Sequence, residues 1–194
     1  MVWLEIETKV AIPKEEVSKV RKRILKIARF EKKESRGDDY FAIQEKGYPK
    51  KAFRIRKKGD IYQVNFKKWL TNLWTKEVVV KQEFEFKIKN ENVKPFLALM
   101  EDHGFKEWMK KRKNSESYIY KEDKRVVIEI NKVAHLGYFM EIEYLAQKSE
   151  VERARKKIIK VLEKLEIPLE WIDNTGYTKM LWYKGVKDRK YFID

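Results

Sequence analysis

Charged and apolar residues alternate along several short segments of the chain, and the first of them reads Glu5-Ile6-Glu7-Thr8-Lys9. Residues two apart in a strand share a face, so this alternation predicts a strand over 2–10. One side of that strand carries two carboxylates and an ammonium group, and the other side is apolar. The same alternation predicts further strands at 53–56, 61–67, 77–88, 124–133 and 138–145.

Apolar residues at helical spacing predict three helices between the strands, at 13–28, 93–100 and 151–165. Pro13 suits the first turn of the first helix, and His103-Gly104 closes the second. Ser149-x-x-Glu152 is interpreted as a capping box that begins the third helix.

The remaining segments complete the expected order. Two short strands, 29–35 and 39–44, are expected on either side of a turn at Arg36-Gly37-Asp38, and another strand at 106–121. The tail 169–194 is expected to hold a short helix and a terminal strand or arm. Strand groups alternate with helices and no linker separates them, which predicts one antiparallel α+β domain over 1–194.

Composition narrows the classes of partner. Charged residues make up 40% of the chain, and Lys+Arg outnumber Asp+Glu by 46 to 31, giving a net charge of +15. Such a chain attracts polyanions, but its basic residues are spread evenly, which argues against nucleic acid. The absence of cysteine excludes disulfide and thiolate chemistry. With no leader pattern and no apolar run of membrane-spanning length, we expect a cytoplasmic protein.

The charged faces of the strands allow two interpretations. An antiparallel sheet with one face in water shows this alternation. Alternatively, the charged faces line an interior, which must then hold compensating ions or a ligand. The pairs Glu5/Glu7 and Glu141/Glu143 bring like charges close together, and a hard cation such as Mg²⁺ or Mn²⁺ would relieve their repulsion. Arginine and lysine on neighbouring strands suit phosphate oxygens.

The motifs, taken in order, resemble those of the CYTH domain family. The matching segments are Glu5-x-Glu7-x-Lys9, Arg54-x-Arg56, Lys67, Lys81-x-Glu83-x-Glu85 and Leu136-Gly137-x-Phe139-x-Glu141-Ile142-Glu143. This family includes class IV adenylate cyclases and thiamine triphosphatases, and is also called the triphosphate tunnel metalloenzymes. The resemblance covers nearly the whole chain. It implies a closed eight-stranded antiparallel β-tunnel with a charged interior and helices packed outside.

The resemblance also implies a role for each matching residue. The metal ligands for Mg²⁺ or Mn²⁺ would be Glu5, Glu7, Glu129, Asn131, Glu141 and Glu143. The triphosphate would be bound by Lys9, Arg54, Arg56, Lys67, Lys81, Lys110 and Arg112. Glu83, Glu85 and Tyr177 would orient these groups, and the catalytic residues would be Lys9, Glu5 and Glu7.

Two of these assignments depend on local detail. The run Lys110-Lys111-Arg112-Lys113 leaves the register of its strand open by one residue, and one step exchanges the faces. Asn131 stands where the family usually has Asp.

The favoured function is a divalent-metal-dependent triphosphatase acting on inorganic triphosphate, a nucleoside triphosphate or thiamine triphosphate. The first alternative is a class IV adenylate cyclase that makes cyclic AMP and pyrophosphate from ATP. The second is a non-enzymatic binder of polyphosphate or RNA. Trp69, Trp74 and Trp182 are candidates for stacking on a base, with packing in the core or at the rim as the alternative. The sequence leaves both a monomer and a homodimer open.

Overall fold

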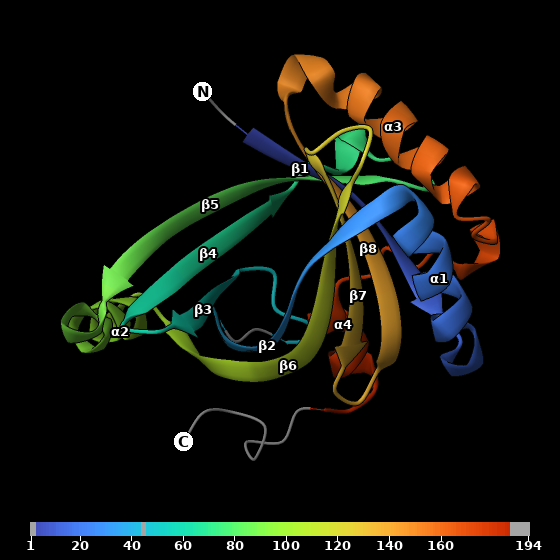
Figure 1. The fold of residues 1–194 in the computed structure, drawn as a ribbon. Coiled ribbons are helices and arrows are strands. Elements are labelled where there is room, and N and C mark those ends of the chain that lie inside the picture. Colours follow the sequence, from blue (N-terminus) through green and yellow to red (C-terminus); the bar gives the residue numbers. More distant parts are fainter. Residues whose placement is uncertain (1–2, 44–45, 187–194) are drawn as a thin grey trace. The chain divides into compact units, whose positions relative to one another are not determined.

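The computed structural model describes residues 3–43 and 46–186 of the chain. Eight antiparallel strands close into a barrel in the order β1-β5-β4-β3-β2-β6-β7-β8, with helices outside (Figure 1). The strands are β1 (Trp3–Ile12), β2 (Ala28–Ile43), β3 (Ala52–Lys58), β4 (Ile61–Trp69), β5 (Val79–Lys89), β6 (Phe105–Tyr120), β7 (Val126–Val133) and β8 (Gly137–Gln147). The helices are α1 (Val17–Ile27), α2 (Val93–Asp102), α3 (Val151–Lys164) and α4 (Tyr177–Tyr183). This confirms the predicted α+β barrel.

Two compact units make up the described part of the chain. Of the described residues, unit 1 takes 3–35, 68–83 and 113–174, and unit 2 takes 36–43, 46–67, 84–112 and 175–186. Four strands, β2, β4, β5 and β6, contribute residues to both units. The assignment of 1–194 to one domain stays a prediction.

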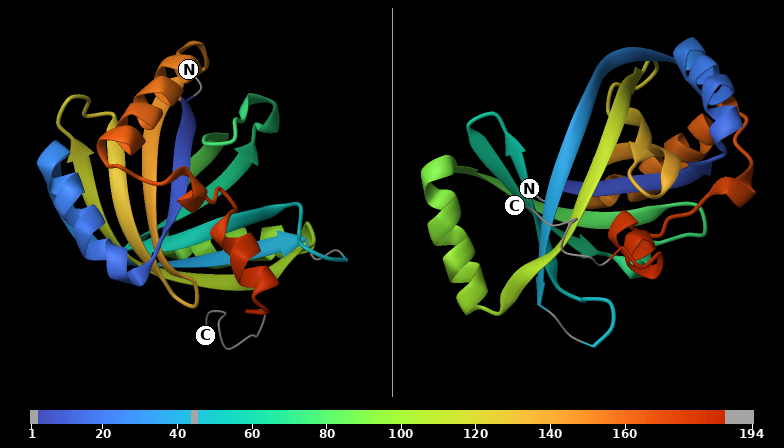
Figure 2. Two further views of the ribbon diagram at one scale, coloured as in Figure 1. Left: turned by 90° about the vertical axis from the view of Figure 1, so that its right-hand side faces the viewer. Right: turned by 90° about the horizontal axis from the view of Figure 1, so that it is seen from below.

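The apolar core of unit 1 lies under two helices. Leu4, Ile6 and Val10 on β1 are buried in one cluster with Ile24 of α1 and Ile158 of α3. The orange helix α3 lies along β8 and β1 (Figure 2, left). Burying each large aliphatic side chain stabilises the fold by ~1.5–3 kcal/mol. The apolar face of β1 therefore points to the helices, as the alternation predicts.

Unit 2 has a smaller aromatic core. Phe41 and Phe53 stack with their ring centroids 5.2 Å apart, and Phe96 of α2 packs edge-on against Phe53. Strands β3 and β4 form the predicted hairpin, and Gly59 in its turn has φ +60°. That backbone conformation favours glycine because a Cβ atom would be strained there.

The predicted turn at Arg36-Gly37-Asp38 is wrong, because β2 runs without interruption from Ala28 to Ile43. Gly37 is not among the residues of positive φ, so its backbone is ordinary extended strand. Asp38 is fully buried and does not lie in a solvated turn.

The predicted capping box is also placed wrongly. Gln147 and Glu150 exchange the two capping hydrogen bonds, and the Glu150 carboxylate accepts from the Gln147 backbone N–H at 3.1 Å. A short 3-10 turn over Lys148–Glu150 precedes α3, and this turn moves the cap upstream of Ser149.

The C-terminal tail contains the expected short helix, α4. The expected terminal strand or arm falls mainly on 187–194, outside the described residues. Among the helices of the described segments, none is both long and apolar enough to cross a membrane.

Candidate functional site

Five carboxylates, four of them buried and that of Glu143 half-buried, gather on three neighbouring strands of unit 1. The register sets Glu7 of β1 opposite Glu143 of β8, and Glu129 of β7 opposite Glu141 of β8. Two groups result, in each of which one oxygen from every carboxylate lies within 4.8 Å of the others. The first group is Glu5, Glu7 and Glu143, and the second is Glu129, Glu141 and Glu143. Glu143 therefore belongs to both groups.

Two lysines neutralise part of this charge. The Lys81 ammonium lies 3.3 Å from Glu5 Oε1 and also donates to Glu7. The Lys113 ammonium lies 3.0 Å from Glu129 Oε2 and 3.3 Å from Glu141 Oε2. Buried ion pairs of this kind hold their geometry tightly, because separating either partner leaves an uncompensated charge.

Negative charge nevertheless remains in excess around the first group. Burial, together with the neighbouring Glu5 carboxylate, raises the pKa of Glu7 to about 7 against the opposing charge of Lys81. Burial and the charges of Glu5 and Glu129 raise the pKa of Glu143 well above its usual value. Burial lowers the pKa of Lys9, against the opposing charges of Glu141 and Glu7.

The donor set fits a hard divalent cation. Both groups offer carboxylate oxygens only, which Mg²⁺ and Mn²⁺ prefer as ligands. Burial is the main cause of the raised pKa values of Glu7 and Glu143, and repulsion between neighbouring carboxylates adds to it. A cation between these side chains would relieve that repulsion.

Hydrogen bonds from β6 and β7 fix the second group. Asn131 Nδ2 donates to Glu141 Oε2 at 2.7 Å, and Ser115 Oγ donates to Asn131 Oδ1 at 2.6 Å. Ser117 Oγ donates to Glu129 Oε1 at 3.0 Å. An aspartate at position 131 lacks the N–H that binds Glu141, which gives the departure from the family pattern a physical role. Sequence reasoning missed both serines, although they continue the two-residue period from Lys113.

A second charged cluster, in unit 2, surrounds Asp38. Its Oδ1 accepts from Arg56 Nε at 2.6 Å, its Oδ2 lies 2.9 Å from the Lys111 ammonium, and Arg54 Nε is 3.9 Å from Oδ1. Burial alone would raise the pKa of this carboxyl, but the charge of Lys111 and the hydrogen bond from Arg56 hold it well below its usual value. The predicted phosphate ligands Arg54 and Arg56 therefore share a buried counter-ion.

The predicted orienting residues have different surroundings. Glu85 lies 3.7 Å from Arg54 Nη2 and accepts from Asn65 Nδ2 at 3.3 Å. The Tyr177 ring, at the start of α4, has the Lys111 ammonium 5.3 Å from its centroid. Glu83 on β5 and Lys67 on β4 are half-buried. Their orienting and binding roles stay predictions.

The sequence left the register of the strand near residue 110 open by one residue, and the structure buries Lys111 and Lys113 in place of the expected pair Lys110 and Arg112. Lys111 and Lys113 are buried with the other inward residues of β6, whereas Arg112 is exposed and Lys110 lies 3.8 Å from Asp39. Four consecutive cations carry no alternation, so the sequence does not reveal which pair faces the carboxylates.

Sequence reasoning also missed Asp38. The register pairs Asp39 with Ile55, which places Asp38 across from Arg56. Treating 29–44 as one strand would have put Asp38 on the face of Arg56, so the alternation held a usable signal.

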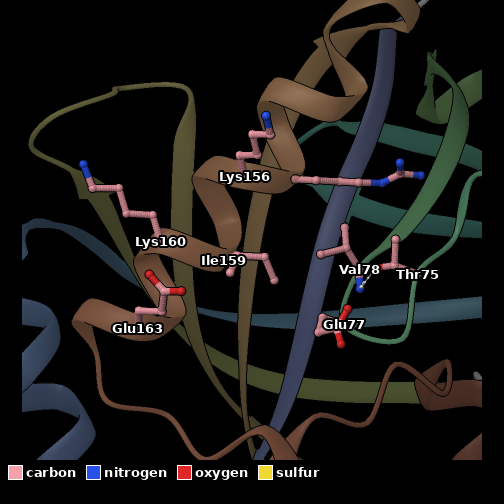
Figure 3. Close-up of a pocket in the computed structure, with 8 residues that line it drawn as sticks. Thr75, Glu77, Val78, Lys156, Ile159, Lys160 and Glu163 are labelled. Atoms are coloured by element: carbon pink, nitrogen blue, oxygen red, sulfur yellow. Dashed lines mark hydrogen bonds between the residues drawn. The ribbon is translucent and has the colours of Figure 1, made fainter.

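A cavity of about 460 Å³ lies in another part of unit 1 (Figure 3). The segment before β5 contributes Thr75, Glu77 and Val78, and α3 contributes Arg155, Lys156, Ile159, Lys160 and Glu163. None of these residues belongs to the predicted site.

The model of the CYTH domain matches residues 4–177. The match spans most of the chain and confirms the resemblance inferred from the motifs. None of the curated proteins compared with the chain matches it.

Solved structures share the fold. The PH1819 protein of Pyrococcus horikoshii OT3 is 26% identical with a TM-score of 0.70, over 93% of this chain and 99% of that one. A candidate adenylate cyclase from Vibrio parahaemolyticus is 12% identical with a TM-score of 0.69, over 94% and 99% of the two chains. A candidate adenylyl cyclase from Hippeastrum, described as having a dominant triphosphatase activity, is 16% identical with a TM-score of 0.62, over 95% and 97%.

Proposed function

The chain belongs to the CYTH domain family, and from that premise we propose that it is a divalent-metal-dependent triphosphatase. The observation that carries the proposal is the pair of buried carboxylate groups joined by Glu143. Burying this much like charge is costly unless a cation balances it. The dominant triphosphatase activity described for the Hippeastrum protein favours hydrolysis over cyclisation.

The carboxylates are the proposed ligands of Mg²⁺ or Mn²⁺. Glu5, Glu7 and Glu143 would hold one ion, and Glu129 and Glu141 with Glu143 a second. A bound ion would supply charge neutralisation on the phosphate oxygens and polarise the phosphorus centre. Asn131 and Ser117 would keep the second group aligned through their hydrogen bonds.

The basic residues are the proposed ligands of the phosphate oxygens. Lys81 and Lys113 now pair with glutamates, and their ammonium groups become phosphate donors once the carboxylate charge is balanced. Burial disfavours the charged form of Lys9 and lowers its pKa, and a phosphate oxygen beside it would stabilise its ammonium group. Within unit 2, Arg54 and Arg56 offer planar, bidentate donors and Lys111 is buried beside the same Asp38, so these three side chains are proposed as phosphate ligands of that unit.

Product analysis tests the proposal. The protein is incubated with Mg²⁺ or Mn²⁺ and with ATP, inorganic triphosphate or thiamine triphosphate in turn. We expect orthophosphate and the corresponding diphosphate. Formation of cyclic AMP and pyrophosphate from ATP would establish the cyclase instead. If no triphosphate is turned over, the non-enzymatic binder is the remaining alternative.

A double variant tests the metal site. Glu5→Gln/Glu7→Gln removes two carboxylate ligands at nearly constant volume. We expect turnover to fall by more than about 100-fold, the upper end of what losing a mere supporting partner costs. The exposed Glu170→Gln is the matched control and should keep wild-type turnover. Wild-type turnover in the double variant would contradict the proposed ligands.

A further inference from the structure

Two tryptophans of unit 1 form an open aromatic corner. Trp69 ends β4, and Trp74 lies in the segment that leads to β5. Their ring centroids are 5.4 Å apart with an interplanar angle of 69°, so the rings stand as two walls. Trp69 is 39% exposed and Trp74 is 38% exposed. The two rings are adjacent, so they form one continuous patch of exposed aromatic surface that a planar ligand can contact.

The corner adjoins the first carboxylate group. The Lys81 ammonium lies 4.7 Å from the centroid of the Trp69 ring. The same ammonium is 3.3 Å from Glu5 Oε1 and donates to Glu7. One side chain therefore separates the tryptophan ring from the proposed ion and phosphate ligands.

Backbone and side-chain hydrogen bonds hold the corner in place. Val80 O accepts from Leu70 N at 3.0 Å and from Trp74 Nε1 at 3.1 Å. Thr75 Oγ1 accepts from Val78 N at 3.1 Å. A ligand that enters such a fixed corner loses less free energy to ordering the protein.

Packing at the rim does not account for the tryptophans. The segment between β4 and β5 is anchored by Leu70 and Leu73, which pack against the apolar core of unit 1. The tryptophan rings keep more than a third of their surface exposed while the leucines provide the anchor. The rings are thus free to contact a ligand.

We propose that Trp69 and Trp74 bind the planar aromatic ring of an organic triphosphate, whose phosphates are held by the neighbouring lysines beside the proposed metal ligands. This inference rests on the proposed function and specifies its substrate class. Any nucleobase has a π face that stacks on an indole ring, as does the pyrimidine of thiamine. The protein therefore prefers nucleoside or thiamine triphosphate to inorganic triphosphate.

Substrate comparison on tryptophan variants tests the inference. KM is measured for ATP, thiamine triphosphate and inorganic triphosphate with the wild type, Trp69→Ala, Trp69→Phe and Trp74→Ala. We expect Trp69→Ala to raise KM for the organic substrate about tenfold or more, which is the usual cost of removing a stacking ring. KM for inorganic triphosphate should change less than about twofold, since that substrate offers no ring to stack. Trp69→Phe should retain most of the affinity for the organic substrate.

A matched control and a binding measurement complete the test. Phe84→Ala removes an exposed aromatic ring of unit 2, 46% exposed, and should leave all KM values unchanged. Tryptophan fluorescence, titrated with Mg²⁺ present and recorded before appreciable turnover, should be quenched by ATP or thiamine triphosphate but not by inorganic triphosphate. Trp69→Phe should lose most of that quenching, and circular dichroism checks that each variant is folded.

The failures of the two proposals are distinguishable. A wild type that hydrolyses no triphosphate defeats the proposed function. A wild type that hydrolyses triphosphates, with Trp69→Ala raising KM equally for organic and inorganic substrates or for neither, defeats only the aromatic corner. Equal quenching of tryptophan fluorescence by all three ligands would also defeat only the aromatic corner. The larger KM change between ATP and thiamine triphosphate identifies which ring the corner accepts.

Discussion

Asp38 has no exposed side-chain surface, yet it lies within ion-pair distance of Arg56, Lys111 and Arg54. Its carboxylate is what makes burial of those cations tolerable. Removing one partner of a buried pair leaves uncompensated charge, which costs more than the pair itself contributes. At the residue scale, the fold needs this aspartate to balance the buried cations, although the sequence motifs did not point to it.

We therefore predict that Asp38→Asn destabilises the protein by about 3 kcal/mol or more at neutral pH. Urea unfolding followed by circular dichroism measures the change. The pKa of this carboxyl is lowered in the folded state, so its contribution is complete above the unfolded pKa of about 3.9 and is lost as pH falls below it. The difference between wild type and variant should stay constant from about pH 5 to 8 and narrow below about pH 4. A difference that narrows between pH 5 and 8 would contradict this account.

Asn131 yields a second prediction. Asn131→Asp removes the hydrogen bond to Glu141 and sets another carboxylate beside it. Without metal, we expect a loss of about 1–3 kcal/mol, the usual cost of an unsatisfied buried polar group. Mg²⁺ or Mn²⁺ should raise the midpoint of thermal unfolding more in the variant than in the wild type, because an extra ligand is present. An equal rise of the thermal midpoint in both proteins would show that the side chain at position 131 does not contact the ion.

At the scale of elements, the sequence predicted those strands correctly in which charged and apolar residues alternate. β1, β7 and β8 have clear alternation, because one face packs under helices and the other holds charged side chains. β6 has none around Lys110–Lys113, so the register there depends on contacts with other strands. Glycine misled the assignment of β2, since glycine signals a turn only where the backbone requires positive φ.

The two glycines make a matched pair for a test of this argument. Gly37 lies in extended β2 with no atom within 4 Å of an added Cβ, whereas Gly59 has φ +60°. We predict that Gly37→Ala stabilises the fold by up to about 0.5–1 kcal/mol, since glycine weakens a strand. Gly59→Ala should destabilise it by about 1 kcal/mol, since a side chain is strained in that region. The midpoints of urea unfolding measure both changes in stability. Destabilisation by Gly37→Ala would contradict an extended backbone at Gly37 and support a turn at 36–38.

For the whole molecule, the closed barrel and its family could be predicted from ordered motifs, but the cross-strand ion pairs could not. The Lys81 contacts join strands far apart in sequence, the Lys113 contact to Glu129 joins two consecutive strands, and the distances of both follow from the register. These pairs supply positive charge to the carboxylate groups without a metal ion. Folding should therefore not depend on metal.

We predict that the metal-free wild type, prepared with a chelator, keeps its far-ultraviolet circular dichroism, and that its thermal midpoint falls only by the amount that the bound ion had added. Mg²⁺ with inorganic triphosphate, each at about 100 times its Kd, should raise the midpoint by about 5–10 °C, since ligands that bind only the native state stabilise it by mass action. Unfolding by the chelator would show that the lysines do not replace the ion.

The lysine–glutamate pairs have a consequence for the life of the protein in a cell. A polypeptide that completes its fold with built-in counter-ions can be synthesised and can accumulate when metal is scarce. Under the proposed function, its quantity is then set by expression, and its activity is set separately by the supply of divalent ions. A fall in free Mg²⁺ or Mn²⁺ would inactivate the existing molecules without unfolding them and exposing them to proteolysis. Their activity would return with the metal, without new protein synthesis.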